Sequence, residues 1–308
     1  MKDVILDTDI GGDCDDAGAL VILKSFVEQQ AINLMCVTSC TTMEGAEHCI
    51  YSVFKDYHLE VPIGVNRGPA FMDTEKFNKY AFQVKKQCDD PAVTDAVSLL
   101  RKTLAGVATK VTVIAIGPQR NLYSLLKSGP DEISGLDGAS LVEQKVEELV
   151  VMGGCFTKEA VFFRHKVEQI AEFNIAMDIA AAQYVSENWR TPIVYSPFEL
   201  GHEIYTGRNL PAGQTAKYCY DLRHNYEKSI GDDSYPGLRE SWDPIAACYG
   251  AVGCGELFSL SNFGKVSFDE TGRSAFTVLK ECPAFPHRIL QGAAGSGEIE
   301  QALEALMC

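Results

Sequence analysis

The chain of 308 residues carries 42 acidic and 27 basic side chains, which gives a formal net charge of −15 at pH 7. This acidic balance, with no basic stripe, excludes nucleic acid and anionic membrane surfaces as expected partners. The hydrophobic fraction of 46% is sufficient for a sizeable core, and the length fits one large domain over residues 1–308.

The sequence shows no secretory signal, because the first three residues lead directly into an apolar strand. No apolar run approaches the ~20 residues that a membrane helix requires. The eleven cysteines are scattered and contain no CxxC pair, so we expect reduced, mostly buried thiols and no structural zinc. These features together predict a cytoplasmic protein.

Apolar segments with strand character alternate along the chain with segments of helical period. Strands are expected to include residues 4–6, 32–38, 61–65, 111–116, 146–152 and 192–196. Helices are expected over residues 17–23, 44–54, 92–108, 178–185 and 245–252, with a further helix that ends at residue 126. The alternation predicts an α/β fold with an open, mainly parallel sheet flanked by helices and joined by right-handed crossovers.

Two stretches interrupt this alternation. Residues 66–90 are polar and irregular, and we expect a loop with one helical piece there. Residues 201–241 are rich in Tyr, Gly, His and Asp and are weakly periodic. We expect this second stretch, called the excursion below, to leave the core, and its length makes it a candidate lid.

The acidic loop, residues 7–16, reads Asp-Thr-Asp-Ile-Gly-Gly-Asp-Cys-Asp-Asp and holds five aspartates. It joins the end of a predicted strand to the start of a predicted helix, and ligands of open α/β sheets bind at such strand ends. The helix dipole offsets one carboxylate by ~0.3–1 kcal/mol, which is too little for five. A hard cation held by the carboxylates would relieve their repulsion.

Four further motifs lie at predicted strand ends or helix starts. They read Ile-Gly-Pro-Gln-Arg-Asn-Leu at residues 116–122, Val-Met-Gly-Gly at 151–154, Ala-Glu-Phe-Asn-Ile at 171–175 and Ser-Trp-Asp-Pro at 241–244. Together with the acidic loop, and in this order over essentially the whole chain, they resemble the inosine-uridine preferring nucleoside hydrolase family. The resemblance implies a Rossmann-like fold, a homo-oligomer, and Ca²⁺-dependent cleavage of the N-glycosidic bond of a nucleoside-like small molecule, as in purine and pyrimidine salvage.

The resemblance also implies roles for individual residues. The calcium ligands would be Asp9, Asp16, the backbone carbonyl of Ile116 and Asp243. Asp9 would also act as the general base that deprotonates a water.

The sugar would be bound by a second group of residues. Asp15 would bind the ribose hydroxyls, with Glu172 and Asn174 on the other side of the sugar, and Asp7 would support the site from behind. This chemistry is plausible on its own terms, because Ca²⁺ prefers oxygen ligands. Acidic surroundings also stabilise the positive charge that develops on a ribosyl carbon.

The chain departs from the family pattern at four places. The acidic loop is two residues longer than the commoner form, which makes Asp13 extra. Trp242 stands where relatives often carry a histidine that protonates the leaving group, and we expect its indole to stack on that group. No asparagine follows the second strand at residues 38–42, and Lys166 replaces an asparagine six residues before Glu172.

Less specific interpretations remain open at this point. Trp242 could be a core aromatic residue, and Glu172 and Asn174 could merely cap the helix that starts near Asp178. His202 and His224 could be surface residues or could donate a proton.

At the level of function, one alternative is a calcium-loaded protein that binds a nucleoside or sugar without turnover. A weaker alternative is a phosphatase of the haloacid dehalogenase type, which also starts with a strand and Asp-x-Asp. That class commonly has an acidic pair after a later strand, whereas Cys155 follows Gly153-Gly154 here.

Overall fold

The computed structural model describes residues 1–69, 80–162, 165–231 and 236–308, with the backbone alone for residues 159–162 and 165–168. Its centre is a sheet with a continuous parallel run in the order β15-β9-β6-β5-β1-β2-β3-β4. These strands are β1 (Lys2–Thr8), β2 (Ile32–Ser39), β3 (Ile63–Val65), β4 (Val93–Asp95), β5 (Val111–Ala115), β6 (Val146–Met152), β9 (Ile193–Ser196) and β15 (His287–Gly292). The expected open, mainly parallel α/β sheet is confirmed.

An antiparallel extension continues the sheet beyond β15. It consists of β13 (Gly264–Phe268) and β14 (Ser274–Val278), while β12 (Phe258–Leu260) pairs with β15 off the main path. Two small antiparallel pairs lie apart from the sheet, namely β7 (Glu159–Phe162) with β8 (His165–Glu168) and β10 (Tyr205–Thr206) with β11 (Arg239–Glu240). Neither these two small pairs nor the strands after residue 252 were predicted from the sequence.

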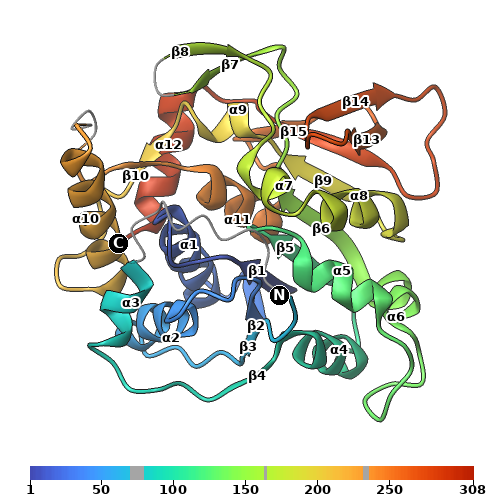
Figure 1. The fold of residues 1–308 in the computed structure, drawn as a ribbon, viewed down its shortest axis with the longest axis horizontal. Helices are drawn as coiled ribbons and strands as arrows, with labels where there is room; N and C mark the ends of the chain where they lie inside the picture. Colours follow the sequence, from blue (N-terminus) through green and yellow to red (C-terminus); the bar gives the residue numbers. More distant parts are fainter. Residues whose placement is uncertain (70–79, 163–164, 232–235) are drawn as a thin grey trace.

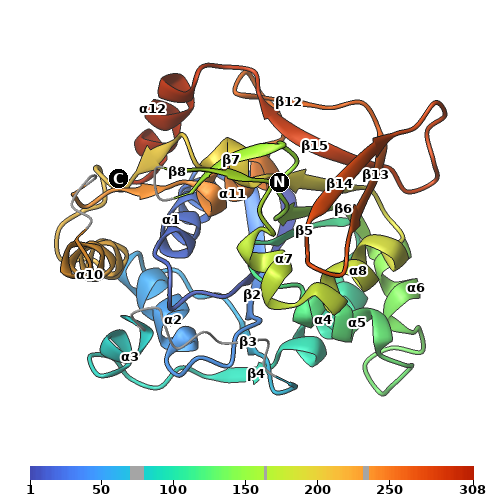
Figure 2. The same ribbon diagram turned by 45° about the horizontal axis from the view of Figure 1, so that its top comes forward.

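Helices cover both faces of the sheet (Figures 1 and 2). One face carries α1 (Asp15–Glu28), α2 (Ala46–Asp56), α3 (Tyr80–Lys85), α10 (Thr215–Ser229), α11 (Trp242–Val252) and α12 (Ser296–Leu306). The other carries α4 (Ala96–Gly106), α5 (Arg120–Lys127), α6 (Gly138–Lys145) and α8 (Ile179–Asn188). Along β1, Val4 and Leu6 join the first hydrophobic cluster and Ile5 joins the second, as the two-residue period of a doubly covered strand requires.

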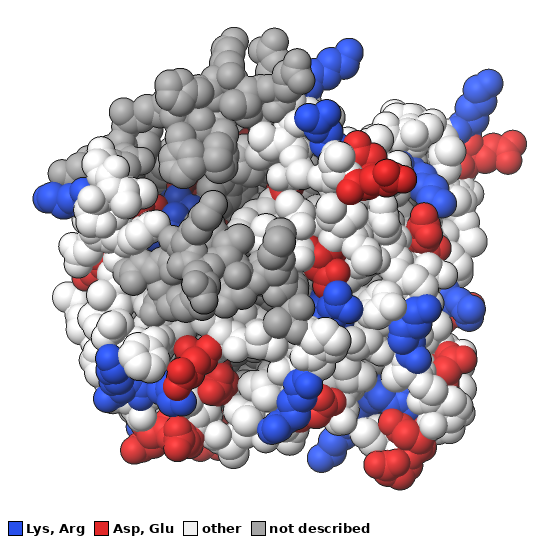
Figure 3. Space-filling model, viewed as in Figure 1, with Lys and Arg blue, Asp and Glu red and all other residues white. Residues whose placement is uncertain are grey.

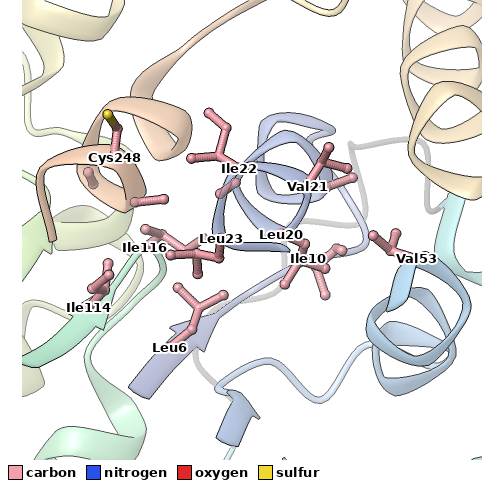
Figure 4. Packing of buried hydrophobic residues seen from close by; sticks show 14 of the residues in the cluster. Leu6, Ile10, Leu20, Val21, Ile22, Leu23, Val53, Ile114, Ile116 and Cys248 are labelled. Atoms are coloured by element: carbon pink, nitrogen blue, oxygen red, sulfur yellow. The ribbon is translucent and has the colours of Figure 1, made fainter. Parts of the chain in front are cut away.

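The first cluster is built around α1, which lies between α11 and α2 (Figure 4). Its apolar side chains from residues 19–23 meet Leu6 of β1 and Ile114 of β5. At Gly250 of α11 an added Cβ would lie 2.4 Å from Ile114 Cδ1, so this helix packs very close to β5. This close packing holds the last turn of α11 against β5.

The structure corrects one predicted helix. Residues 92–108 were expected to form a single helix, but residues 93–95 form β4, which pairs with β3. The helix starts only at Ala96, because the Asp95 side chain caps it by accepting a hydrogen bond from Ser98 N at 2.8 Å. The strand partner of β4 is distant in sequence, so helical periodicity alone could not reveal it.

The excursion over residues 201–241 contains the end of α9 (Phe198–Gly201), β10, α10 and β11. The helical piece expected in residues 66–90 is α3, and residues 70–79 lie outside the described part of the chain. Among the described residues, no helix is both long and apolar enough to cross a bilayer. On the face in Figure 3, acidic and basic side chains lie interspersed, and its described surface shows no continuous basic stripe.

Candidate active site

The first turns of α1 and α11 bring three aspartates together. Asp15 and Asp16 begin α1, and Asp243 is the second residue of α11. One carboxylate oxygen from each of the three lies within 4.8 Å of the other two, and all three residues are buried. Asp15 Oδ2 also accepts a hydrogen bond from Asp243 N at 3.2 Å, which joins the two helix starts directly. Carboxylates converging in this way can hold a divalent cation.

Asp9 lies on the strand side of this cluster. It follows β1, and an added Cβ at Gly117 would lie 2.8 Å from Asp9 Oδ1, so this carboxylate rests against the turn that contains Ile116. Ile116 N donates a hydrogen bond to Asp7 O at 2.8 Å. The structure therefore places Asp9 beside Ile116, and Asp16 beside Asp243.

The tightest cluster differs in one residue from the ligand set expected from sequence. It contains Asp15, expected to bind sugar, and does not contain Asp9. Asp9 is still close enough for its charge to raise the pKa values of Asp16 and Asp243. It is also only partly buried, whereas Asp15, Asp16 and Asp243 are buried.

Burial is the main cause of the raised pKa values in this region. It raises the pKa of Asp9 to about 8, with repulsion from neighbouring acidic groups in addition. It also raises the pKa values of Asp15, Asp16 and Asp243 well above the ordinary range, and their mutual repulsion raises them further. Both effects disfavour the ionised carboxylates, so a hard cation among these oxygens would offset the repulsion. The donor set therefore fits such an ion.

A second group of side chains forms hydrogen bonds with residues of the acidic loop. Asp7 Oδ1 accepts hydrogen bonds from Thr38 Oγ1 at 2.5 Å and from Asn121 Nδ2 at 2.7 Å. Thr8 Oγ1 donates to Asp16 Oδ1 and accepts from Ile10 N at 3.1 Å. Sequence reasoning missed Thr38 and Asn121, although Asn121 belongs to one of the strand-end motifs.

Glu172 and Asn174 lie at the start of α7 (Phe173–Met177). Glu172 accepts hydrogen bonds from Gly154 N at 3.2 Å and Asn174 N at 2.9 Å, so it does cap a helix. The helix it caps is α7, whereas α8 is capped by Asp178 itself. Burial raises the pKa of Glu172 to about 7.

The Asn174 amide bridges two strand ends. Its Nδ2 donates to Ile116 O at 3.3 Å and to Met152 O at 3.2 Å. The amide thus contacts the same carbonyl that the family resemblance assigns to the cation. A carbonyl oxygen has two lone pairs, so this hydrogen bond leaves one for a second partner.

Trp242 packs in an aromatic group with Phe198 and His202. The ring centroids of Trp242 and Phe198 are 5.4 Å apart, and those of Trp242 and His202 are 6.2 Å apart. The indole Nε1 donates to Phe198 O at 2.9 Å, and the Arg239 guanidinium lies 5.0 Å from the ring centroid. His202 Nδ1 lies 3.8 Å from a carboxylate oxygen of Glu240. Of the two histidines named from sequence, His202 is therefore the one that contacts Trp242.

The extra residue of the acidic loop, Asp13, is not part of the aspartate cluster. Its carboxylate is bound by Arg239, with Arg223 3.7 Å away. Both arginines belong to the excursion, and sequence reasoning missed them because no motif marks them. Lys166, the other open departure, falls among residues 159–168, whose side chains lie outside the described part of the structure.

Comparison with known sequences gives two findings. The sequence model of the family described as inosine-uridine preferring nucleoside hydrolase matches residues 4–262. The pyrimidine-specific ribonucleoside hydrolase RihA of Salmonella typhimurium is 26% identical over 213 residues, a match that covers 65% of this chain and 61% of that protein. The chain thus spans less than two thirds of the length of this relative.

Known structures share the whole fold. The inosine-uridine preferring nucleoside hydrolase of Bacillus anthracis matches with a TM-score of 0.69 and 18% identity, over 100% of this chain and 99% of that one. The type III effector protein XopQ, solved in complex with adenosine diphosphate ribose, matches with a TM-score of 0.71 and 17% identity, over 99% and 92% of the two chains. At these identities the similarity establishes a common architecture.

Proposed function

Because this chain belongs to the inosine-uridine preferring nucleoside hydrolase family, we propose that it is a Ca²⁺-dependent N-ribohydrolase. Its substrate would be a ribonucleoside or a related ribosyl compound. The observation that carries the proposal is the convergence of buried carboxylates from the starts of α1 and α11, with the more open Asp9 beside them. Family membership favours this function over the phosphatase alternative.

The proposed cation ligands are Asp9, Asp16, the carbonyl of Ile116 and Asp243. When bound, Ca²⁺ would lower the pKa of a coordinated water and offset the charge of the carboxylates. Asp9 would take the proton of the attacking water, since it is the one residue among Asp9, Asp15, Asp16 and Asp243 that is only partly buried. Burial raises the pKa of Asp9 in the cation-free protein, and a bound cation would lower it again, so that the carboxylate is ionised and can accept a proton.

The ribose would lie between the acidic loop and the start of α7. Asp15 on one side, and Glu172 and Asn174 on the other, are proposed to bind its hydroxyls. Departure of the nucleobase leaves positive charge on the ribosyl carbon. Preorganised carboxylates around that carbon stabilise this charge without rearranging during the reaction.

Leaving-group activation is proposed to involve Trp242 and His202. A tryptophan cannot protonate a departing base, but its ring can stack on one. The His202 imidazole, 6.2 Å from the indole centroid and near the Glu240 carboxylate, is the favoured proton donor over His224.

The alternative of binding without turnover is motivated by Trp242, since no histidine precedes Asp243. Purified protein with Ca²⁺ should be incubated with a panel of purine and pyrimidine ribonucleosides, with adenosine diphosphate ribose as an additional probe. Release of reducing sugar supports the hydrolase. Ligand binding measured by calorimetry without any released sugar would establish the binding protein instead.

A cytoplasmic location and a homo-oligomeric state are also proposed. All eleven cysteines are free thiols, as a reducing compartment would maintain them. The oligomeric state follows from the family resemblance alone, and light scattering coupled to size-exclusion chromatography measures it directly.

A further inference from the structure

A two-point ion pair connects the acidic loop to the excursion. Arg239 Nε donates to Asp13 Oδ1 at 2.7 Å, and Arg239 Nη2 donates to Asp13 Oδ2. The planar guanidinium therefore binds both oxygens of one carboxylate, which fixes the relative orientation of the two side chains as well as their separation. The partners are 226 positions apart in the sequence, so the contact is a tertiary one.

The two partners stand immediately upstream of the two segments that form the aspartate cluster. Asp13 comes shortly before Asp15 and Asp16, and Arg239 shortly before Asp243. We propose that Asp13 and Arg239 are positioning residues, which hold the starts of α1 and α11 together so that their carboxylates can share one cation. The inference rests on the proposed function, because the cation is the one assigned there.

Further contacts keep this pair in place. Arg239 Nη1 also binds Glu240 at 2.5 Å and Glu227 of α10 at 3.3 Å. Arg223 binds the same Glu227 at 2.8 Å and lies 3.7 Å from Asp13. The arginines are thus oriented by carboxylates on α10 and β11, and not by the acidic loop alone.

The loop side is equally restrained. Gly11 N donates to Tyr80 Oη at 3.2 Å, and Tyr80 Oη donates to Asp13 O. Gly11 has a φ of 138°, which a residue with a side chain rarely adopts. The backbone around Asp13 is therefore held on both sides of the ion pair.

The pair has a consequence for cation binding. Three buried carboxylates within 4.8 Å repel one another when they are ionised, and this repulsion acts to separate the two helix starts. A contact that opposes this separation keeps the cluster formed in advance and reduces the ordering required on binding. Residues that orient metal ligands from outside the coordination sphere typically change metal affinity by ~10–100-fold.

The test is calorimetric titration of Ca²⁺ into the full-length, cation-free protein. Asp13→Asn and Arg239→Gln should each weaken Ca²⁺ affinity ~10–100-fold. The double variant should bind about as weakly as either single variant, because the two side chains act through one contact. Arg239→Lys keeps the positive charge but cannot bind both carboxylate oxygens as arginine does. The Ca²⁺ affinity of this variant should therefore lie between those of wild type and Arg239→Gln.

A matched control removes a different ion pair of the excursion. Arg208 binds Glu300 of α12 at 3.2 Å and is largely exposed, so Arg208→Gln should leave Ca²⁺ affinity unchanged. Far-ultraviolet circular dichroism identifies variants that fail to fold. If Asp13→Asn or Arg239→Gln does not fold, the Ca²⁺ affinity of Arg239→Lys tests the inference.

Ca²⁺ affinities of folded Asp13→Asn and Arg239→Lys that equal wild type would overturn the inference. Wild type that binds Ca²⁺ but releases no sugar from any nucleoside would overturn the proposed function and leave the positioning role supported by the affinities. Wild type that binds no Ca²⁺ overturns both.

Discussion

At the scale of single residues, the aspartates of the acidic loop have three different environments. Asp9 is partly open at a strand end, Asp16 is buried in a helix start, and Asp13 is paired with Arg239. The sequence predicted that a hard cation would relieve the repulsion among these charges. It could not show that Asp13 is balanced by arginine, because the partner lies 226 positions away and no motif marks it.

Asp9→Asn tests the proposed general base. The amide cannot take a proton from water, so kcat on a nucleoside that the wild type hydrolyses should fall ~10²–10⁴-fold. Asp3→Asn, near the opposite end of β1, is the matched control and should retain normal turnover. Near-normal kcat in Asp9→Asn would show that another group accepts the proton.

Replacement of His202 and Trp242 tests leaving-group activation. If His202 donates the proton, His202→Gln should reduce kcat/KM for inosine by ~10²-fold or more. It should hardly change kcat/KM for p-nitrophenyl riboside, whose leaving group departs without protonation. Trp242→His in the His202→Gln background should restore part of the loss.

His224→Gln is the comparison variant for that experiment. Equal losses on both substrates in His202→Gln would indicate a structural role for this histidine. A selective loss on inosine in His224→Gln would move the role of proton donor to α10.

At the scale of elements, β1, β2, β3, β5, β6 and β9 were predictable because each carries its own apolar pattern, whereas β15 of the same parallel run was not predicted. The short strand β4 was not predicted either, because its three residues form a strand only through pairing with β3. The loop after β1 was located correctly. The Ser-Trp-Asp-Pro motif does mark a helix start, although α11 begins at Trp242 and the helix was predicted over residues 245–252. The distance between this loop and this helix start depends on how α11 packs on β5, which no local pattern encodes.

Gly250→Ala tests that packing. The new methyl group would lie 2.4–2.5 Å from the Ile114 side chain, so α11 must shift or Ile114 must move. Such overpacking typically costs ~1–3 kcal/mol of unfolding free energy. Urea denaturation measures the loss, and Gly250→Ala combined with Ile114→Ala should be more stable than the sum of the two single effects predicts.

Gly253→Ala is not a suitable control, because Gly253 has a φ of 77°. Gly106→Ala at the end of α4 is suitable, since an added Cβ there meets no atom within 4 Å. It should leave stability unchanged or slightly raised. Additive effects in the Gly250 and Ile114 pair would show that the methyl group is accommodated elsewhere.

At the scale of the whole molecule, the buried acidic groups couple stability to pH. Burial raises the pKa of Asp7 and of Glu172 to about 7 and that of Asp9 to about 8. At these three groups the folded state therefore binds more protons than the unfolded state between about pH 4 and pH 8, while the pKa of His287, lowered by burial to about 4, acts in the opposite direction in the acid half of this range. The stabilising contribution is fully present at the acid end of this range and is lost as pH rises through the folded-state pKa values.

The expected result is a Tm that falls from pH 5 to pH 8 when EDTA removes cations. Added Ca²⁺ should raise Tm most at pH 8, where the carboxylates are ionised, and at 100 times its Kd it adds ~2.7 kcal/mol. Differential scanning fluorimetry in matched buffers measures both effects. A Tm in EDTA that rises over this range would contradict the assigned shifts.

The contact between Asp15 and Asp243 joins positions 228 apart in the chain, and this separation imposes an order of events during synthesis. The ribosome releases β1 and α1 long before α11, so the contact between α1 and α11 can form only after most of the chain has been synthesised. Closing so large a loop comes late on the folding pathway. Ca²⁺ should therefore slow unfolding in stopped-flow experiments and leave the refolding rate nearly unchanged. The ion would stabilise the folded state once it has formed and would not accelerate folding.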